Sequence, residues 1–354
     1  MGIHALKYIL ALHLCLSLSS CSNLIYDSEG DCETVYELQF VYDHNMKWAD
    51  AFGSEVDAVT LHVFDSHTGH HILSTTEKGD ELKREGYTMK LELPAGDYDM
   101  TAWCGLGAHD EGVSFSIPEV DHEQTRREHL TCRMSRTPDE DGNGGIVKIE
   151  NGLNSLFHGH ISTTLPEGDG LKVRLKMPLV KNTNNITIVL QSLSGKVIDP
   201  SMYEFTIQDN NGLMDCDNNI LPDENITYHS WSVSGGSAEI IRSGETEAED
   251  NESGKTMSAV VANLTTGRLM SEHKPILTVR SNTADNPKIL FRIPVIDYAL
   301  MVKGNYNQPI SDQEYLDRQD EYNMTFFLDE NGEWLRSYIY INKWKVVVED
   351  FDID

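Results

Sequence analysis

The sequence predicts an all-β protein made of two β-sandwich domains in tandem. Apolar and polar residues alternate with a period of two over many short runs, most clearly in residues 56–64. Clusters of turn-forming residues separate these runs, and stretches with helical periodicity are scarce. Short strands joined by turns are typical of β-sandwiches, and 354 residues are long for one such domain but comfortable for two.

The first half of the chain contains the clearest strand patterns. Strands are expected at residues 35–42, 56–64, 71–75, 87–93 and 98–104. The sequences DSHTG and PAGD separate neighbouring runs with turn-forming residues, so consecutive strands can form hairpins. A short helix or a loop is expected over residues 48–56.

A change in composition near the middle of the chain predicts the domain boundary. Residues 137–145 (TPDEDGNGG) combine proline, glycine and acids and offer no apolar residue to bury. We therefore assign residues 32–136 to the first sandwich, 137–150 to a linker and 151–354 to the second sandwich. Further strands are expected at residues 171–177, 186–193, 203–208, 259–264, 276–279, 289–296 and 337–348, with a helix over 309–318.

The amino-terminal segment has the organisation of a secretory signal peptide. Its mostly apolar run, residues 9–18, is about half as long as a helix that spans a bilayer. The run ends at Leu18-Ser19-Ser20-Cys21, which is similar to a bacterial lipobox. The pattern predicts a signal peptide over residues 1–20, a lipidated tether over 21–31, and diacylglyceryl and acyl groups on Cys21. An ordinary secreted chain with a chance cysteine is the alternative.

The chain is strongly acidic. It has 28 Lys and Arg against 57 Asp and Glu, which gives a formal net charge of -29 and a pI near 4.7. Such a surface repels nucleic acids and anionic lipid headgroups, so no nucleic-acid partner is expected. We expect contact with the outer membrane through the lipid on Cys21 and not through a basic patch.

Four cysteines remain after the signal peptide and the lipid site. Cys32, Cys104, Cys132 and Cys216 are an even number in an oxidising compartment, so they are candidates for disulfides. Three pairings are possible, and the sequence does not choose among them. The absence of a CxxC pair argues against a zinc site or thioredoxin-like chemistry.

Several blocks along the chain resemble a known family. FVYDHNMKWADAF (residues 40–52), VDAVTLHVFDSHTG (56–69), LPAGDYDMTAWCG (93–105), LFHG (156–159), LVKNTNNITIVL (179–190) and INKWKVVVEDFDI (341–353) are similar to blocks of the FimB-type fimbrial anchor lipoproteins of Bacteroidales. The lipobox and Cys32 also match. The resemblance implies two transthyretin-like β-sandwich domains and a lipidated subunit at the base of a fimbrium. It also implies that a fimbrial shaft subunit is the partner and that the anchor ends shaft growth.

One acidic loop matches a calcium-binding pattern. Asp139, Asp141, Asn143 and Glu150 have the ligand spacing of an EF-hand loop. An EF-hand also needs two flanking helices, and Pro138 stands where the first helix would end. We therefore expect an acidic linker and treat the four residues as a weak calcium candidate. No cofactor is expected beyond the covalent groups on Cys21.

No sequence motif is typical of an enzyme. A G-x-S-x-G elbow is absent, and carboxylates are too frequent in this chain for any pair to be informative. His67, His70 and His71 cluster in a predicted turn, and His158 and His160 form an HxH pair. Neither group has a known metal-ligand spacing, so an exposed loop and a structural role are the better interpretations.

The final predicted strand is a candidate for contact with a partner. Tyr340, Asn342, Trp344, Val346 and Val348 are expected on one face, and the opposite face is half apolar. Such a strand could enter a groove of the shaft subunit, or it could be the ordinary last strand of the second sandwich. The first strand, residues 35–42, is expected to stay in place and keep its own groove closed.

Two other functions remain open at this point. The chain could be a surface lipoprotein that binds glycan or host protein through its tryptophans, which are Trp48, Trp103, Trp231, Trp334 and Trp344. It could also be a tip or shaft subunit of a similar fimbrium. For Trp103 and Trp344, core packing is the expected role.

Overall fold

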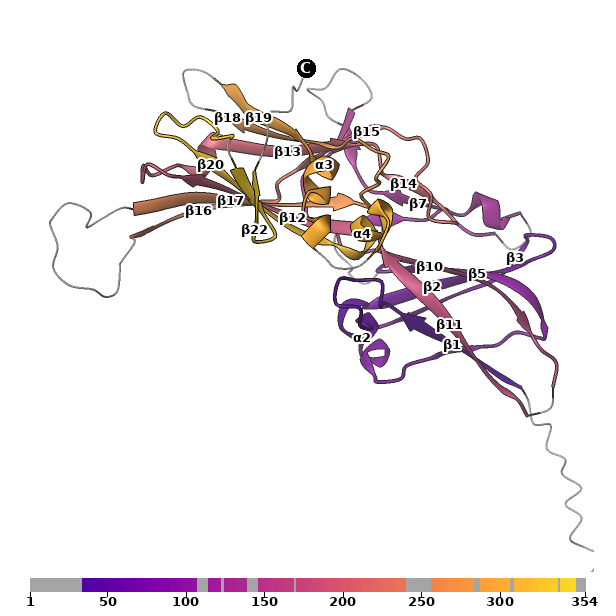
Figure 1. The fold of residues 1–354 in the computed structure, drawn as a ribbon. Coiled ribbons are helices and arrows are strands. Elements are labelled where there is room, and N and C mark those ends of the chain that lie inside the picture. Colours follow the sequence, from indigo (N-terminus) through magenta and orange to yellow (C-terminus); the bar gives the residue numbers. More distant parts are fainter. Residues whose placement is uncertain are drawn as a thin grey trace, which may run out of the picture.

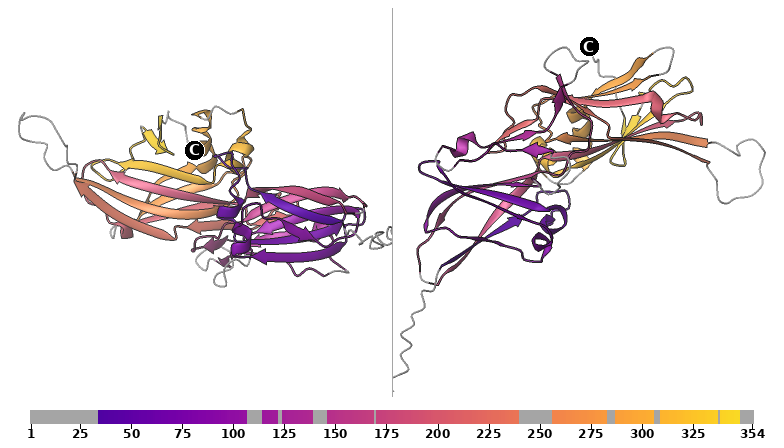
Figure 2. Two further views of the ribbon diagram at one scale, coloured as in Figure 1. Left: turned by 90° about the horizontal axis from the view of Figure 1, so that it is seen from below. Right: turned by 180° about the vertical axis from the view of Figure 1, so that it is seen from behind.

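The computed structural model describes residues 34–106, 114–121, 124–138, 146–168, 170–239, 256–282, 287–305, 309–336 and 338–347. Within these ranges the chain forms two β-sandwiches that lie next to each other (Figures 1 and 2). The predicted all-β fold is confirmed. No helix within the described ranges is long and apolar enough to cross a membrane.

The first sandwich is one folded sheet of seven strands in the order β3-β2-β5-β10-β11-β1-β4. The long strand β11 connects its two layers, because residues 172–178 pair in parallel with β1 and residues 179–181 pair with β10. The strands are β1 (Val35–Val41), β2 (Ala58–Asp65), β3 (His71–Lys78), β4 (Met89–Leu91), β5 (Gly96–Cys104), β10 (Phe157–Leu165) and β11 (Lys172–Lys181).

The second sandwich packs two six-stranded sheets face to face around the larger core. One sheet has the order β16-β17-β12-β20-β21-β22, and the other has the order β19-β18-β13-β15-β9-β8. Their strands are β8 (Thr137–Pro138), β9 (Ile146–Ile149), β12 (Thr183–Ser192), β13 (Tyr203–Asp209), β15 (Asn225–His229), β16 (Ser232–Glu239), β17 (Thr256–Gly267), β18 (Ile276–Ser281), β19 (Lys288–Pro294), β20 (Glu321–Leu328), β21 (Tyr338–Ile341) and β22 (Trp344–Val347).

The remaining elements are short. A small sheet contains β14 (Leu213–Asp215), β7 (Thr131–Met134) and β6 (Phe115–Ser116). The helices are α2 (Phe52–Glu55), α3 (Val295–Leu300) and α4 (Asp312–Arg318), and the 3₁₀ turns are η1 (Asp80–Lys83), η2 (Arg127–His129), η3 (Pro200–Met202) and η4 (Lys303–Asn305). α4 lies in the segment where the sequence predicts a helix, and α2 lies in the segment where a short helix or a loop is expected.

The division of the chain between the sandwiches differs from the predicted boundaries. β8 and β9 fall within the predicted linker, yet both belong to a sheet of the second sandwich. β10 and β11 come later in the chain, yet they complete the sheet of the first sandwich. The chain therefore forms β1 to β5 in the first sandwich and then β8 and β9 in the second. It returns to the first sandwich with β10 and β11, and the strands from β12 onward are not part of the first sandwich.

An ion-pair group joins the two sandwiches where the chain leaves β11. Lys181 ends that strand and is only 8% exposed. Its Nζ lies 3.0 Å from Glu55 Oε2 in the first sandwich and 2.6 Å from Asp320 Oδ2 next to β20. Because both carboxylates approach one buried ammonium, the charge is compensated from both sides of the junction.

A second contact fixes the loop after β1 to helix α4. The Nη1 group of Arg318 donates to the backbone oxygen of Asp43 at 3.2 Å, and its Nε donates to Glu314 Oε1 at 2.9 Å. The guanidinium carbon of Arg318 lies 3.6 Å from a ring centroid of Trp48. Stacking on an indole favours a cation in this position. The loop that follows the first strand is therefore held by the second sandwich.

Candidate functional site: the first strand and the terminal hairpin

The first strand is fully integrated into its sheet. β1 lies between β11 and β4 and pairs with both. Tyr36, Leu38 and Phe40 are at most 4% exposed, while the residues between them are partly exposed. This alternation follows the sequence pattern and turns one face of the strand toward the core. Each large apolar side chain buried in this way stabilises the fold by about 1.5–3 kcal/mol.

The contacts of β1 continue beyond both of its ends. The backbone N–H of Val35 donates to the oxygen of Leu171 at 2.8 Å. Just after the strand, Tyr42 is completely buried, with its ring 4.9 Å from that of Phe157 in an edge-on arrangement. The N–H of Tyr42 donates to Asp50 Oδ1 at 2.9 Å. The groove that β1 occupies is therefore filled along its whole length.

The terminal segment is a hairpin and not a single strand. β21 and β22 pair antiparallel, and the two residues between them, Asn342 and Lys343, have φ angles of 46° and 72°. Two consecutive left-handed residues are typical of the type I′ turn, which suits a two-residue hairpin. The prediction of one strand over residues 337–348 is therefore wrong, because this turn reverses the chain.

The turn also changes which side chains share a face. Ile339 is paired with Val346 and Ile341 with Trp344 across the hairpin, and residues paired in this way point to the same side. Ile339 and Ile341 are completely buried in the large core, and Val346 packs against it. Trp344 remains 44% exposed, so the expected core role of this indole is wrong.

The other predicted members of this face lie elsewhere. Tyr340 is paired with Lys345 on the opposite side of the hairpin, with its ring 6.0 Å from that of Phe327. Asn342 occupies the turn, where its Oδ1 accepts from the N–H of Asn323 at 2.8 Å. Val348 lies outside the described residues. Of the five candidates, only Trp344 and Val346 point to the same side of a described strand.

The hairpin forms an edge of its sheet. β21 pairs with β20 through only Met324–Ile341 and Thr325–Tyr340, and β22 is the last strand in the sheet order. An edge strand presents backbone donors and acceptors to which a strand of another chain can pair. The geometry therefore places a short edge with a half-exposed indole at the carboxy-terminal end of the described chain.

The cysteines do not pair in the part of the chain that the structure covers. Cys104, Cys132 and Cys216 are buried free thiols, and each lies in a different core cluster. Burial raises the pKa of all three thiols, that of Cys216 to about 11. They are therefore protonated and poor nucleophiles at neutral pH. Cys21 and Cys32 lie outside the described residues, so lipidation and any disulfide of Cys32 stay predictions.

Strands, and not helices, flank the acidic loop with the calcium-like spacing. Thr137 of β8 pairs with Lys148 of β9, and Glu150 forms an ion pair with Lys148 (Oε1–Nζ 3.0 Å). Asp139, Asp141 and Asn143 lie outside the described residues. No cluster of three or more His, Cys, Asp or Glu side chains suited to a metal occurs among the residues that are described.

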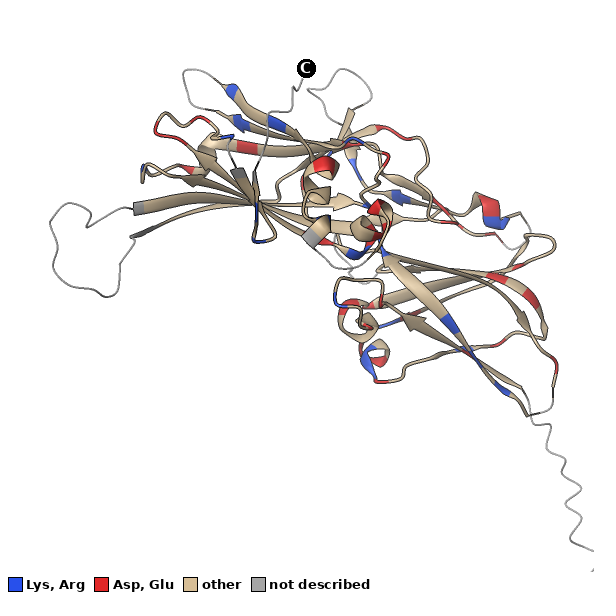
Figure 3. Ribbon diagram, in the orientation of Figure 1, with Lys and Arg blue, Asp and Glu red and all other residues tan. Residues whose placement is uncertain are grey.

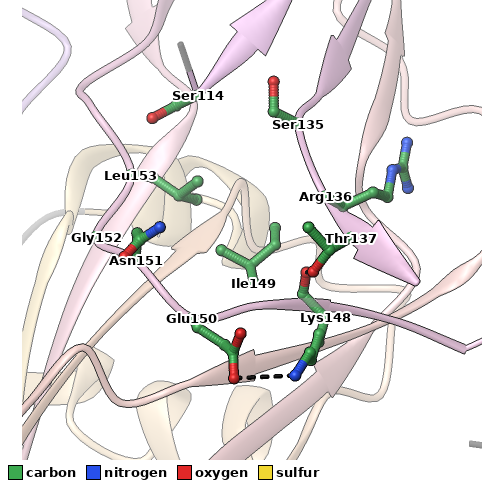
Figure 4. A pocket seen from close by; sticks show the side chains of 10 residues that line it. All are labelled: Ser114, Ser135, Arg136, Thr137, Lys148, Ile149, Glu150, Asn151, Gly152 and Leu153. Carbon is green, nitrogen blue, oxygen red and sulfur yellow. Dashed lines mark hydrogen bonds and ion pairs between the residues drawn. The ribbon is translucent and has the colours of Figure 1, made fainter. Parts of the chain in front are cut away.

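A cavity of about 260 Å³ lies beside the same two strands (Figure 4). Its lining contains hydroxyl groups, the amide of Asn151 and the Lys148–Glu150 ion pair, together with apolar carbon from Ile149 and Leu153. None of the lining residues is a histidine or a cysteine, so the cavity lacks the usual pairing of a nucleophile with a base.

His62, His71 and His158 occupy structural positions. His62 Nδ1 and His71 Nε2 each lie 2.7 Å from Ser74 Oγ, and His158 Nε2 lies 3.1 Å from the backbone oxygen of Cys216. Burial lowers the pKa of His62 and of His158 to about 4, so both imidazoles are neutral at pH 7. His71 is only 6% exposed, which corrects its expected place in an exposed loop.

Sequence reasoning missed the residues of the junction. Lys181 lies inside the block LVKNTNNITIVL, where a lysine at the end of an apolar strand was a usable signal of a buried ion pair. Arg318 gave no such signal, because an arginine at the end of an amphipathic helix is ordinarily solvated.

Solved structures with the same fold define the class of protein. A proposed adhesin from Bacteroides thetaiotaomicron VPI-5482 is 34% identical, with a TM-score of 0.74 over 89% of this chain and 97% of that chain. A proposed polysaccharide-binding protein from the same organism is 28% identical, with a TM-score of 0.71 over 90% and 99%. The fimbrial anchor protein Mfa2 from Porphyromonas gingivalis, at 16% identity, has a TM-score of 0.60 over 89% and 99% and shares the fold. The class is that of adhesin-like proteins with this fold.

The family follows from the sequence itself. The family model of the fimbrillin-A associated anchor proteins Mfa1 and Mfa2 matches residues 28–350, so the chain belongs to this family. The resemblance derived from the sequence blocks is confirmed. No curated protein matches the sequence.

Proposed function

We propose that the chain is the lipid-anchored base subunit of a fimbrium, which attaches the shaft to the outer membrane and ends shaft elongation. Membership of a family of fimbrial anchor proteins supports a role in a fimbrium. The observation that carries the finer proposal is the position of β1, which is paired on both sides and buries Tyr36, Leu38 and Phe40.

Retention of β1 would end polymer growth in a simple way. A shaft that grows by strand exchange needs an open groove in each subunit for the next donor strand. In this chain β1 fills that groove, and the loop after it is tied to Arg318 of the second sandwich. Removal of β1 would also cut the chain from Cys21, which lies thirteen residues before Thr34. The anchor would therefore accept no further subunit.

The terminal hairpin is the surface that we assign to the shaft subunit. β21 stays in its own sheet, because Ile339 and Ile341 belong to the core of this chain. Among the described strands β22 is the last of its sheet, and Trp344 lies on it. The donated element is thus β22 or its exposed edge, and not one long strand.

Deletion of residues 344–354 tests this assignment in cells that make the fimbrium. The deletion keeps Ile339 and Ile341, so the second sandwich should remain folded. We expect a lipidated, membrane-bound protein that no longer retains fimbriae, seen by immunoblotting of sheared fimbriae and of outer membranes. Fimbriae that stay attached and keep their normal length would show that the hairpin is not the docking surface.

A matched pair of tryptophans provides the control. Trp344 and Trp231 are 44% and 49% exposed, and they lie near opposite edges of the same sheet. Trp344→Ala should weaken retention of fimbriae, whereas Trp231→Ala should not. Equal effects of the two substitutions would indicate a general loss of stability instead of a docking defect.

Glycan binding is a second candidate, favoured by the position of Trp231. Its Nε1 donates to Thr265 Oγ1 at 3.1 Å, which fixes the orientation of the exposed ring. The ring lies against Gly152, a residue that also lines the 260 Å³ cavity. An exposed indole beside a cavity that offers hydroxyl and amide groups suits a sugar ring. Calorimetry with cell-surface polysaccharides tests this candidate, and saturable binding that Trp231→Ala abolishes would support it.

A further inference from the structure

On the outer side of the first sandwich basic residues outnumber acidic ones, although the chain as a whole is acidic. Outward positions of β11 are occupied by Lys172, Arg174 and Lys176, all exposed, and β4 adds Lys90. The outward positions of β1 carry one carboxylate, that of Glu37. We call this surface the basic face. It has four cations and one anion, whereas the chain has 28 basic and 57 acidic residues.

The single carboxylate lies at the centre of the basic face. Glu37 approaches Lys172 (Oε1–Nζ 2.7 Å) and Arg174 (Oε2–Nη2 2.9 Å), and its register partner in β4 is Lys90. Hydrogen bonds from Lys172 and then from Arg174 lower the pKa of Glu37, so it stays ionised. Lys90 also lies 3.8 Å from Glu92, just beyond β4. Counting Glu92, which lies just outside the basic face, two carboxylates oppose four cations and leave an excess of two positive charges.

Screening by salt allows the local positive charge to act on a partner although the chain as a whole is acidic. The Debye length at physiological salt is about 8 Å, whereas the ten residues of β11 extend over about 33 Å. Acidic groups on the second sandwich are therefore largely screened from anything that touches the basic face. The net charge of -29, from which we expected the lipid alone to contact the membrane, therefore does not decide what binds at the basic face.

The position of the basic face points to one kind of partner. Lys172 is paired with Val35 at the beginning of β1, so the face begins where the chain arrives from Cys21. The thirteen residue-to-residue steps from Cys21 to Thr34 can reach at most about 45 Å. Lys and Arg positions continue along β11 on this same sandwich (Figure 3). A lipid on Cys21 would therefore keep the beginning of the basic face within about 45 Å of the membrane surface.

We propose that the basic face rests on the phosphate groups of the outer-membrane surface and so sets the orientation of the anchor. This inference depends on the proposed lipidation of Cys21. The lipid supplies attachment, and the basic face selects which side of the first sandwich lies against the bilayer. A cation near an anionic bilayer surface strengthens binding by about fivefold, so several together suffice to orient a tethered domain.

Amine labelling of the lipidated full-length protein tests the orientation. The protein is reconstituted in vesicles of phosphatidylcholine, with or without about 30% phosphatidylglycerol. We expect Lys90, Lys172 and Lys176 to react at least about threefold more slowly on the anionic vesicles, and about 0.5 M salt should remove the difference. Lys196 and Lys288 of the second sandwich serve as internal controls. Equal reactivity on both vesicles would overturn the proposal.

A second measurement does not need the lipid. Full-length Cys21→Ala protein should float with the anionic vesicles at low salt and not with pure phosphatidylcholine. The combined change Lys172→Gln, Arg174→Gln and Lys176→Gln should weaken this binding at least about fivefold. Lys196→Gln, Arg280→Gln and Arg292→Gln remove the same charge from the second sandwich and should have no such effect.

The two proposals fail in different ways. If Cys21 is not lipidated, the full-length protein leaves neutral vesicles, which contradicts the anchor. If the lipidated protein stays on vesicles but the flotation of the two triple variants is the same, the anchor stands and the basic face does not bind the membrane. Binding that is equal on neutral and anionic vesicles gives the second result as well.

Discussion

At the scale of single residues, Arg318 connects the two sandwiches through its planar guanidinium. It is 8% exposed, donates to Asp43 O and Glu314, and stacks on Trp48. Lysine can carry the charge but offers neither the fork of donors nor the flat surface. We expect Arg318→Lys to lower the free energy of unfolding by about 1–3 kcal/mol in urea titrations. The exposed Arg292→Lys should change it by less than about 0.5 kcal/mol.

Buried histidines predict a loss of stability in mild acid. The folded pKa of His62 and of His158 is about 4, below the value of about 6.5 for an unfolded histidine. The unfolded chain therefore binds protons first as the pH falls through 6.5, and the loss is complete below 4. Each histidine should cost about 2 kcal/mol at pH 5 relative to pH 7.

Thermal unfolding at pH 7 and pH 5 measures this effect. His158→Gln keeps a side chain that can donate to the oxygen of Cys216 but cannot be protonated, so it should reduce the drop in melting temperature between the two pH values. His129→Gln, at an exposed position, should leave the drop unchanged. An equal drop in all three proteins would contradict the assignment to buried imidazoles.

At the scale of elements, the terminal hairpin depends on two residues in the left-handed region. Lys343 has φ 72°, where a β-carbon is unfavourable, so Lys343→Gly should raise the free energy of unfolding by up to about 1 kcal/mol. Lys345→Gly, within β22, should lower it by a similar amount because strand glycines are unfavourable. If both substitutions change the free energy of unfolding in the same direction, the left-handed turn does not determine the stability of the hairpin.

The same hairpin shows why the sequence predicts strands better than their ends. Alternation over residues 35–42 predicts β1 correctly, because one face of that strand meets the core. The pair Asn342-Lys343 lacks the glycine that is typical of type I′ turns. The sequence pattern therefore does not predict the chain reversal within residues 337–348. Alternation over residues 56–64 puts Phe64 on the same face as the polar residues Thr60 and His62, yet Phe64 is buried with Leu130 and Cys216 from distant segments. No local pattern contains that information.

At the scale of the whole molecule, strands of the two sandwiches alternate along the chain. Composition predicts a boundary at residues 137–150, because an acidic glycine-rich segment usually connects domains. In the structure that segment includes β8 and β9 of the second sandwich, while β10 and β11 return to the first. Pairing partners far apart in sequence decide this arrangement, and periodicity does not report them. The resemblance to fimbrial anchors predicts the fold, but it does not predict which strands belong to which sandwich.

This alternation predicts which fragments can fold. Residues 32–136 contain β1 to β5 but lack β10 and β11, so β1 loses its parallel partner and β5 loses β10. Met177 and Leu179 would also be missing from the core that surrounds Leu38. We expect this fragment to stay unfolded, with poorly dispersed amide signals in NMR spectra. Residues 32–185 restore both strands and should give dispersed signals and a cooperative thermal transition. Cooperative folding of residues 32–136 would mean that β10 and β11 are dispensable, and the boundary predicted from composition would then describe the folding units after all.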